Sequence, residues 1–242
     1  MRVALISDLH GSEFALNAVL ADIARTGVDQ IVCLGDVATL GPRPREVLAR
    51  LVELRCICIL GNHDEFMLDD RLLRSYTELP VIVEAVEWCR AELSGGHLQF
   101  IASFSRRFEL ELNGSGSLLL FHGTPDSNTT DLLSTTPSER VDELLGGRRA
   151  TIMAGGHTHI QMLRQHRGTL IVNPGSVGLA FKEYAAGKTP ILLPHAEYAV
   201  IDAVDGDIAV SLRRVVLDKA ELREAAGATA HPLRAWTTQM YA

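Results

Sequence analysis

The sequence has no long hydrophobic run and no cluster of basic residues. No apolar stretch approaches the roughly 20 residues that a membrane-spanning helix needs, so we predict no membrane association. The formal net charge is −7 and no segment is rich in Lys or Arg, which argues against a broad grip on duplex nucleic acid. A predicted strand follows Met1 directly, without the layout of a signal peptide, and we expect a cytoplasmic protein.

Cysteine is also scarce, with four residues in a chain of 242. That number is too small for a disulfide framework in a chain of this length. Cys33, Cys56 and Cys58 lie in predicted strands, and Cys89 lies in a predicted helix. Cys56 and Cys58 alternate along one strand, so their side chains should point to opposite faces and not share a metal. We therefore expect buried, reduced thiols.

The chain lacks internal repeats, low-complexity segments and a Pro/Gly-rich linker. Its 242 residues, 47% hydrophobic and 22% charged, have the composition of a globular protein with one large core. We predict a single domain over residues 1–242, with a C-terminal tail at about 218–242. The tail could pack on the parent domain or on a second copy, so a homo-oligomer stays open.

The order of the predicted elements indicates the fold class. The first third alternates strand and helix, with strands at 3–6, 31–34 and 56–60. This order predicts a parallel sheet with right-handed crossovers. In the middle, Ser94-Gly95-Gly96 should end a helix, and the turn at 113–116 should join a hairpin. The last third is mostly strand, and two sheets packed face to face with helices outside would use all these strands.

Five short motifs that carry His, Asp or Asn each follow directly on an apolar run. They are Asp8-Leu9-His10, Gly35-Asp36, Gly61-Asn62-His63-Asp64, His122-Gly123 and Gly155-Gly156-His157-Thr158-His159. Short apolar runs bounded by glycine predict buried strands, so all five motifs should lie at one edge, where open α/β sheets bind ligands. Imidazole, carboxylate and amide oxygen together predict a metal as that ligand.

Seven of these side chains are candidate ligands for divalent cations. They are Asp8, His10, Asp36, Asn62, His122, His157 and His159. Two cations held by one protein need a shared anionic bridge, because their repulsion would otherwise separate them. A carboxylate can bridge, and Asp36 is the natural candidate. In a strand His157 and His159 would face the same side, whereas in a loop they can reach two metals.

The ordered set Asp-x-His, Gly-Asp, Gly-Asn-His-Asp, His-Gly and Gly-His-x-His resembles the calcineurin-like metallophosphoesterase family over about residues 3–176. The resemblance implies a four-layer αββα sandwich of two mixed sheets flanked by helices, with a dinuclear metal centre. It implies that one metal is held by Asp8, His10 and His159, the other by Asn62, His122 and His157, with Asp36 as the bridge. His63 would sit beside the substrate as a catalytic residue.

Within the family, the turn Asn173-Pro174-Gly175-Ser176 resembles that of small bacterial phosphodiesterase-type members. The sequence departs from the protein phosphatase branch, whose motif Gly-Asp-x-x-Asp-Arg-Gly orients the catalytic His with its second Asp and holds phosphate with its Arg. Thr39 and Leu40 stand at those two positions here. This departure weakens the protein phosphatase hypothesis.

Without that second Asp, His63 must be oriented by another group, and we name Asp64 as the candidate. Asn62 and His63 are also expected to bind substrate. His195 is a third candidate for substrate binding, because it ends a long irregular stretch that begins at Phe181, and loops of that length are uncommon unless functional or mobile.

The sequence thus predicts a metal-dependent hydrolase of small phosphate esters, with phosphodiesters as the leading substrate class. The resemblance implies that a hydroxide bridging two metal ions attacks phosphorus. Manganese, iron, zinc, nickel and cobalt all accept such N/O ligands. A phosphomonoesterase, a protein phosphatase, a nuclease and a non-catalytic metal-binding scaffold stay open as alternatives. The acidic net charge disfavours the nuclease, and the complete ligand set disfavours the scaffold.

Overall fold

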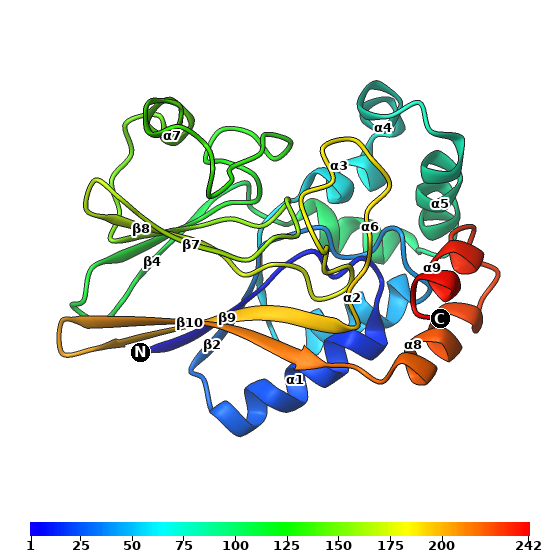
Figure 1. Cartoon of the computed structure of the whole chain (residues 1–242), viewed down its shortest axis with the longest axis horizontal. Coiled ribbons are helices and arrows are strands. Elements are labelled where there is room, and N and C mark those ends of the chain that lie inside the picture. Colours follow the sequence, from blue (N-terminus) through cyan, green and yellow to red (C-terminus); the bar gives the residue numbers. More distant parts are fainter.

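The computed structural model describes all 242 residues. Two five-stranded mixed sheets face each other, and helices cover both outer sides (Figure 1). The predicted α/β sandwich of four layers is therefore confirmed. No helix combines the length and the apolar character that a membrane crossing requires.

The first sheet has the order β10-β9-β1-β2-β3. Its strands are β1 (Arg2–Ile6), β2 (Gln30–Cys33), β3 (Ile57–Cys58), β9 (His195–Val204) and β10 (Asp207–Val216). β1, β2 and β3 run parallel, as the alternation of strand and helix predicts. β9 pairs antiparallel with β1, and β10 pairs antiparallel with β9 along its full length.

The second sheet has the order β4-β5-β6-β8-β7. Its strands are β4 (Phe108–Glu111), β5 (Ser117–Leu120), β6 (Ile152–Ala154), β7 (Met162–His166) and β8 (Thr169–Asn173). β5, β6 and β8 run parallel in the centre, and antiparallel β4 and β7 form the edges. The predicted hairpin at 113–116 joins β4 to β5.

Buried apolar clusters fill the interfaces between the layers. Along β1, Val3 and Leu5 pack in the cluster between the sheets, while Ala4 and Ile6 pack in the cluster beneath the helices. All four are fully buried, and each of the larger ones contributes about 1.5–3 kcal/mol to folding. A strand buried on both faces is an unbroken apolar run in the sequence.

Six helices have eight residues or more. They are α1 (Glu13–Thr26), α2 (Pro44–Glu53), α5 (Pro80–Ala91), α6 (Gly95–Ala102), α7 (Ser138–Leu145) and α8 (Lys219–Gly227). Helices α1 and α2 pack on the outer face of the first sheet, and α7 packs on that of the second (Figure 1). Ser94 follows α5 as predicted, but it also caps α6, because its hydroxyl accepts a hydrogen bond from the His97 amide.

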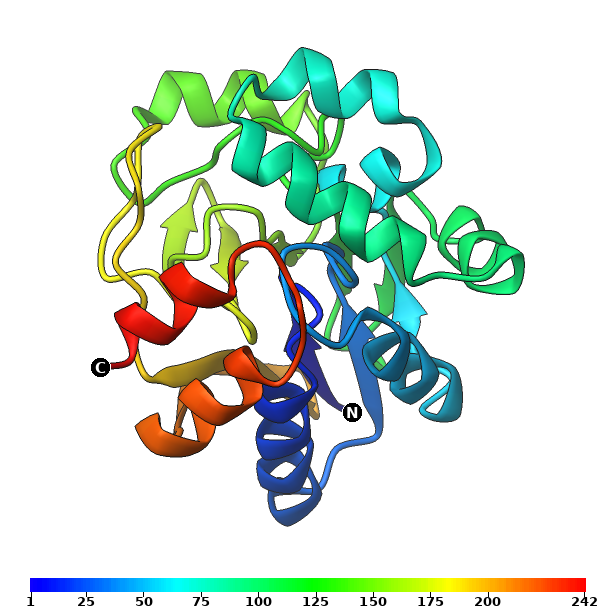
Figure 2. The ribbon, with the colours of Figure 1, turned by 90° about the vertical axis from the view of Figure 1, so that its right-hand side faces the viewer.

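Three further helices have seven residues each and were not predicted. They are α3 (Asn62–Leu68), α4 (Asp70–Tyr76) and α9 (Arg234–Met240). Seven residues make fewer than two turns, which is too short for an apolar face to recur in the sequence. Figure 2 shows α8 and α9, in orange and red, beside the loop that follows β1 in blue.

Candidate metal centre

The five motifs converge on two adjacent groups of ligand atoms at the strand ends. The first group is Asp8, His10 and His159, and the second is Asp36, His122 and His157. In each group the ligand atoms lie within 4.8 Å of one another. Asn62 joins the second group, because its Oδ1 lies 3.1 Å from Nε2 of His122. All seven candidate ligands therefore come together, although they are spread between Asp8 and His159 in the sequence.

The first group has the arrangement that a cation would explain. The Nε2 atoms of His10 and His159 lie 3.1 Å apart, and Oδ1 of Asp8 lies 3.3 Å from Nε2 of His159. Two imidazole nitrogens this close need either a shared proton or a cation between their lone pairs. Oδ1 of Asp8 is also buried without a hydrogen bond. The donor set therefore fits a divalent metal held by imidazole and carboxylate.

The remaining ring nitrogens of three histidines are fixed by protein oxygens. Nδ1 lies 2.7 Å from Leu34 O in His122, 2.7 Å from Leu179 O in His159 and 3.2 Å from Thr39 Oγ1 in His10. Such contacts orient a metal-binding imidazole and leave Nε2 for the metal. Thr39, which stands where the protein phosphatase motif has its second Asp, thus contacts His10.

The backbone at these ligands is strained. The φ angles are positive at Asp8 (53°), His10 (43°), Asp36 (57°), His157 (69°) and His159 (56°). Residues other than glycine rarely adopt this left-handed conformation, and it persists only where surrounding structure enforces it. The strand ends therefore turn sharply enough to aim consecutive motifs at one place. His157 and His159 lie in a loop and reach different groups, as the sequence allowed.

The electrostatics favour ionised carboxylates beside mainly neutral imidazoles. Burial raises the pKa of Asp8, but the neighbouring His159 outweighs burial and leaves that pKa at about 2. Burial lowers the pKa of His10 to about 3, and repulsion from His159 adds to the effect. Burial also opposes charge on His122, yet the Asp36 carboxylate raises its pKa to about 10. Metal binding would displace that proton.

His63 lies beside the first group without joining either set of ligands. Its ring is 5.1 Å from the ring of His10, centre to centre, and perpendicular to it. Nδ1 of His63 is buried and has no hydrogen-bond partner. Burial lowers the pKa of His63. The side chain therefore stands next to the candidate metal centre without belonging to either ligand group.

The Asp64 carboxylate contacts backbone amides and not the ring of His63, so its role in orienting His63 stays a prediction. The Asp64 carboxylate accepts hydrogen bonds from the backbone amides of Asp36 at 2.8 Å, Val37 at 3.0 Å and Gly61 at 2.9 Å. Both of its oxygens are thus used to join two loops. Asp64 positions the backbone of Asp36, and no hydrogen bond links it to the His63 ring.

A matching family model accounts for most of the chain. The model is described as the calcineurin-like phosphoesterase superfamily domain, and it matches residues 1–207. The chain belongs to this superfamily. Its two sheets and outer helices are therefore the calcineurin-like sandwich, and the resemblance of the five motifs is confirmed.

Individual relatives cover nearly the same span. Phosphodiesterase YfcE of Escherichia coli is 29% identical over 189 residues, 74% of this chain and 80% of YfcE. The uncharacterized protein MJ0912 of Methanocaldococcus jannaschii is 27% identical over 222 residues, 89% of this chain and 88% of that protein. The crystal structure of a metallophosphoesterase from Sphaerobacter thermophilus has a TM-score of 0.77 at 26% identity, covering 99% of this chain and 98% of that one.

His195 lies at the start of a strand, and its role in substrate binding stays a prediction. It begins β9 of the calcineurin-like sandwich, and its Nε2 lies 3.0 Å from Oε1 of Glu197. No hydrogen bond or ion pair joins it to a candidate ligand. From the same stretch, Tyr184 instead reaches toward the metal centre through Asp131, to which its hydroxyl donates a hydrogen bond.

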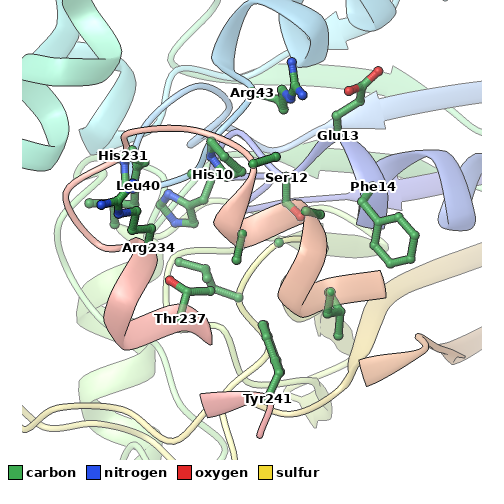
Figure 3. Close-up of a pocket in the computed structure, with 18 of the residues that line it drawn as sticks. His10, Ser12, Glu13, Phe14, Leu40, Arg43, His231, Arg234, Thr237 and Tyr241 are labelled. Atoms are coloured by element: carbon green, nitrogen blue, oxygen red, sulfur yellow. The ribbon is translucent and has the colours of Figure 1, made fainter. Parts of the chain in front are cut away.

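The C-terminal tail packs on the calcineurin-like domain and walls a cavity there. The cavity is about 260 Å³, and His231 and Tyr241 line it from the tail (Figure 3). Leu40 and Leu179 also line it, next to the atoms that fix His10 and His159. The tail lies beyond residue 207, so this wall is an addition to the matched family domain.

Proposed function

We propose that the protein is a dinuclear metal-dependent phosphoesterase that hydrolyses phosphodiesters. One observation carries the proposal: a single oxygen of Asp36 faces imidazoles of both groups. Oδ2 lies 3.4 Å from Nε2 of His122 and 3.9 Å from Nε2 of His10. A carboxylate oxygen between two sets of ligand nitrogens is the arrangement that a bridge between two cations requires.

When bound, the two cations supply an activated water and neutralise charge on the phosphoryl oxygens. Asp8 and Asp36 offset part of the positive charge, and the remaining excess attracts an anionic ester. His63, whose ring lies 5.1 Å from that of His10, would hydrogen-bond the leaving oxygen. Asn62 would complete the second group through its amide oxygen.

Two observations favour diesters over the protein phosphatase alternative. The similar E. coli protein is named a phosphodiesterase. Leu40, at the position of the phosphate-holding Arg of protein phosphatases, packs against the apolar core and has no group that binds phosphate. Neither a guanidinium nor an amide takes its place in the loop Thr39–Arg43 beside His10, since Arg43 faces Glu46.

The proposal is tested by elemental analysis with paired assays of bis(p-nitrophenyl) phosphate and p-nitrophenyl phosphate. We expect about two metal ions per chain, turnover of the diester, and loss of both after chelation. Asp36→Asn should lose metal and activity together, whereas Asp205→Asn, in an exposed turn, should keep both. Absence of bound metal and of turnover of either ester after metal supplementation would favour the scaffold hypothesis.

A further inference from the structure

Three polar side chains from separate segments gather at the open side of the second ligand group. Asp131 Oδ1 lies 3.5 Å from Nε2 of His157, and the Tyr184 hydroxyl donates to Oδ2 of Asp131. Tyr76 lies nearby, with its ring 6.4 Å from that of His63. We propose that the Asp131 carboxylate selects singly charged phosphodiesters by repelling the second negative charge of a phosphomonoester. This inference rests on the proposed phosphoesterase function.

The burial of the two side chains puts Asp131 at the entrance. The His157 side chain is 7% exposed, whereas the Asp131 side chain in contact with it is 40% exposed. Asp131 therefore lies between a buried candidate ligand and solvent. A phosphate ester bound at His157 would therefore lie close to this carboxylate.

The charge of Asp131 is not neutralised by any basic side chain. Its sole ion-pair partner is the candidate ligand His157, and no Lys or Arg side chain pairs with it. Asp126 on the same loop provides the contrast, because Arg107 and Arg148 both pair with it. Among the acidic groups of this loop, Asp131 thus keeps its negative charge available to an incoming anion.

Tyr184 holds the carboxylate in place. Its hydroxyl donates to Asp131, and that hydrogen bond, with burial, raises the pKa of Tyr184 to about 12. The phenol therefore stays a neutral donor throughout the working range of a phosphatase assay. Burial and the charges of Asp36 and Asp131 likewise raise the pKa of Tyr76.

The physical basis is the difference in charge between the two ester classes. A phosphomonoester carries close to two negative charges above pH of about 6, whereas a diester carries one. A fixed carboxylate near the entrance penalises each negative charge of the substrate, so the monoester is penalised twice. For a partly exposed charge several ångströms away, the extra penalty corresponds to a discrimination of roughly fivefold at low ionic strength.

The test compares kcat/KM for bis(p-nitrophenyl) phosphate and p-nitrophenyl phosphate at pH 8 and low salt, with metal content measured in each sample. Asp131→Asn keeps an oxygen for Tyr184 but removes the charge. It should raise the monoester value and lower the diester-to-monoester ratio roughly fivefold. Glu183→Gln is the matched control, because it removes the same charge from an exposed neighbour of Tyr184 that makes no ion pair. It should leave the ratio unchanged.

Added salt provides a second signature. Raising the ionic strength should lower the ratio of the wild-type protein toward that of Asp131→Asn, and should change the ratio of the variant little. Tyr184→Phe, which keeps the charge but frees the carboxylate, should fall between the two. An unchanged ratio in Asp131→Asn would overturn the inference, and so would loss of metal, because Asp131 would then be a ligand.

Binding of inorganic phosphate, measured by calorimetry on the metal-loaded protein at pH 8, needs no turnover. Phosphate is then doubly charged, and Asp131→Asn should bind it roughly 25-fold more tightly, while binding of the singly charged dimethyl phosphate should tighten only about fivefold. Equal changes for both anions would contradict the inference. If the wild-type protein hydrolyses neither ester, the proposed function fails, and this measurement still decides the role of Asp131.

Discussion

The backbone of Gly61 lies directly against the carboxylate of Asp36. A Cβ atom on Gly61 would be 2.1 Å from Asp36 Oδ1 and 2.6 Å from the Asp36 amide. Gly35 approaches Gly61 equally closely, with φ of +104° and a Cβ that would lie 2.6 Å from the Gly61 amide. The glycines of two motifs thus let their loops interlock, and this contact sets where the bridging candidate Asp36 can stand.

Gly61→Ala should therefore displace Asp36 and weaken metal binding. Changes that disturb the support of a metal ligand typically reduce affinity about 10–100-fold, and we expect a loss in this range. Elemental analysis and metal titration measure it. Gly96→Ala is the control, because its Cβ would meet only Ser94 Oγ at 3.7 Å. Equal metal affinity in both variants would show that the contact does not position Asp36.

Asp64→Asn tests whether the Asp64 carboxylate positions the backbone of Asp36. An amide group would replace one carboxylate oxygen and face backbone donors, leaving them unpaired at a cost of about 1–3 kcal/mol in unfolding free energy. Denaturant unfolding should detect this cost, together with weaker metal binding. If the variant keeps its stability and metal but loses turnover, then Asp64 acts through His63 after all.

His63→Ala should keep its metal and lose most of its turnover. The imidazole contacts His10 but belongs to neither ligand group, so its removal leaves both groups intact. Hydrogen-bonding help to a leaving group is worth about 10²–10⁴-fold, and kcat for the diester should fall by that factor. His97→Ala, on the exposed α6, is the control. Loss of metal from His63→Ala would make His63 a ligand.

Stability should fall in mild acid because of His231. Burial among neutral groups, the Cys89 thiol and the Trp88 ring, lowers the pKa of His231 to about 4. The unfolded chain, with a histidine pKa of about 6.5, binds the proton first, so stability is complete above this value and is lost as pH falls toward 4.

The loss attributable to His231 should be about 1–2 kcal/mol between pH 7 and pH 5. His231→Gln removes this titration, so unfolding free energies of the two proteins at both pH values, each in chelator, isolate it. The wild-type protein should lose more stability than the variant over this interval. Parallel losses would mean that His231 does not carry the effect.

Much of the site was recognisable in the sequence because its chemistry is local. Each strand that leads to a ligand is a short apolar run, and each motif follows at once, so Asp8, Asp36 and His122 were identified without any contact information. The role of Asp64 was not, because a hydrogen bond to backbone amides leaves no mark on the residues it joins. The contact between Asp131 and Tyr184 was missed because it joins two side chains that lie far apart in the sequence.

The residues alone determined the sandwich, the strand ends and the seven candidate ligands, since periodicity and turn chemistry act between near neighbours in the chain. Only the folded chain decided which imidazoles face the same oxygen of Asp36 and which carboxylate lies beside His157. Those relationships depend on distances between segments that sequence order does not encode, and a few ångströms separate a metal ligand from a surface charge.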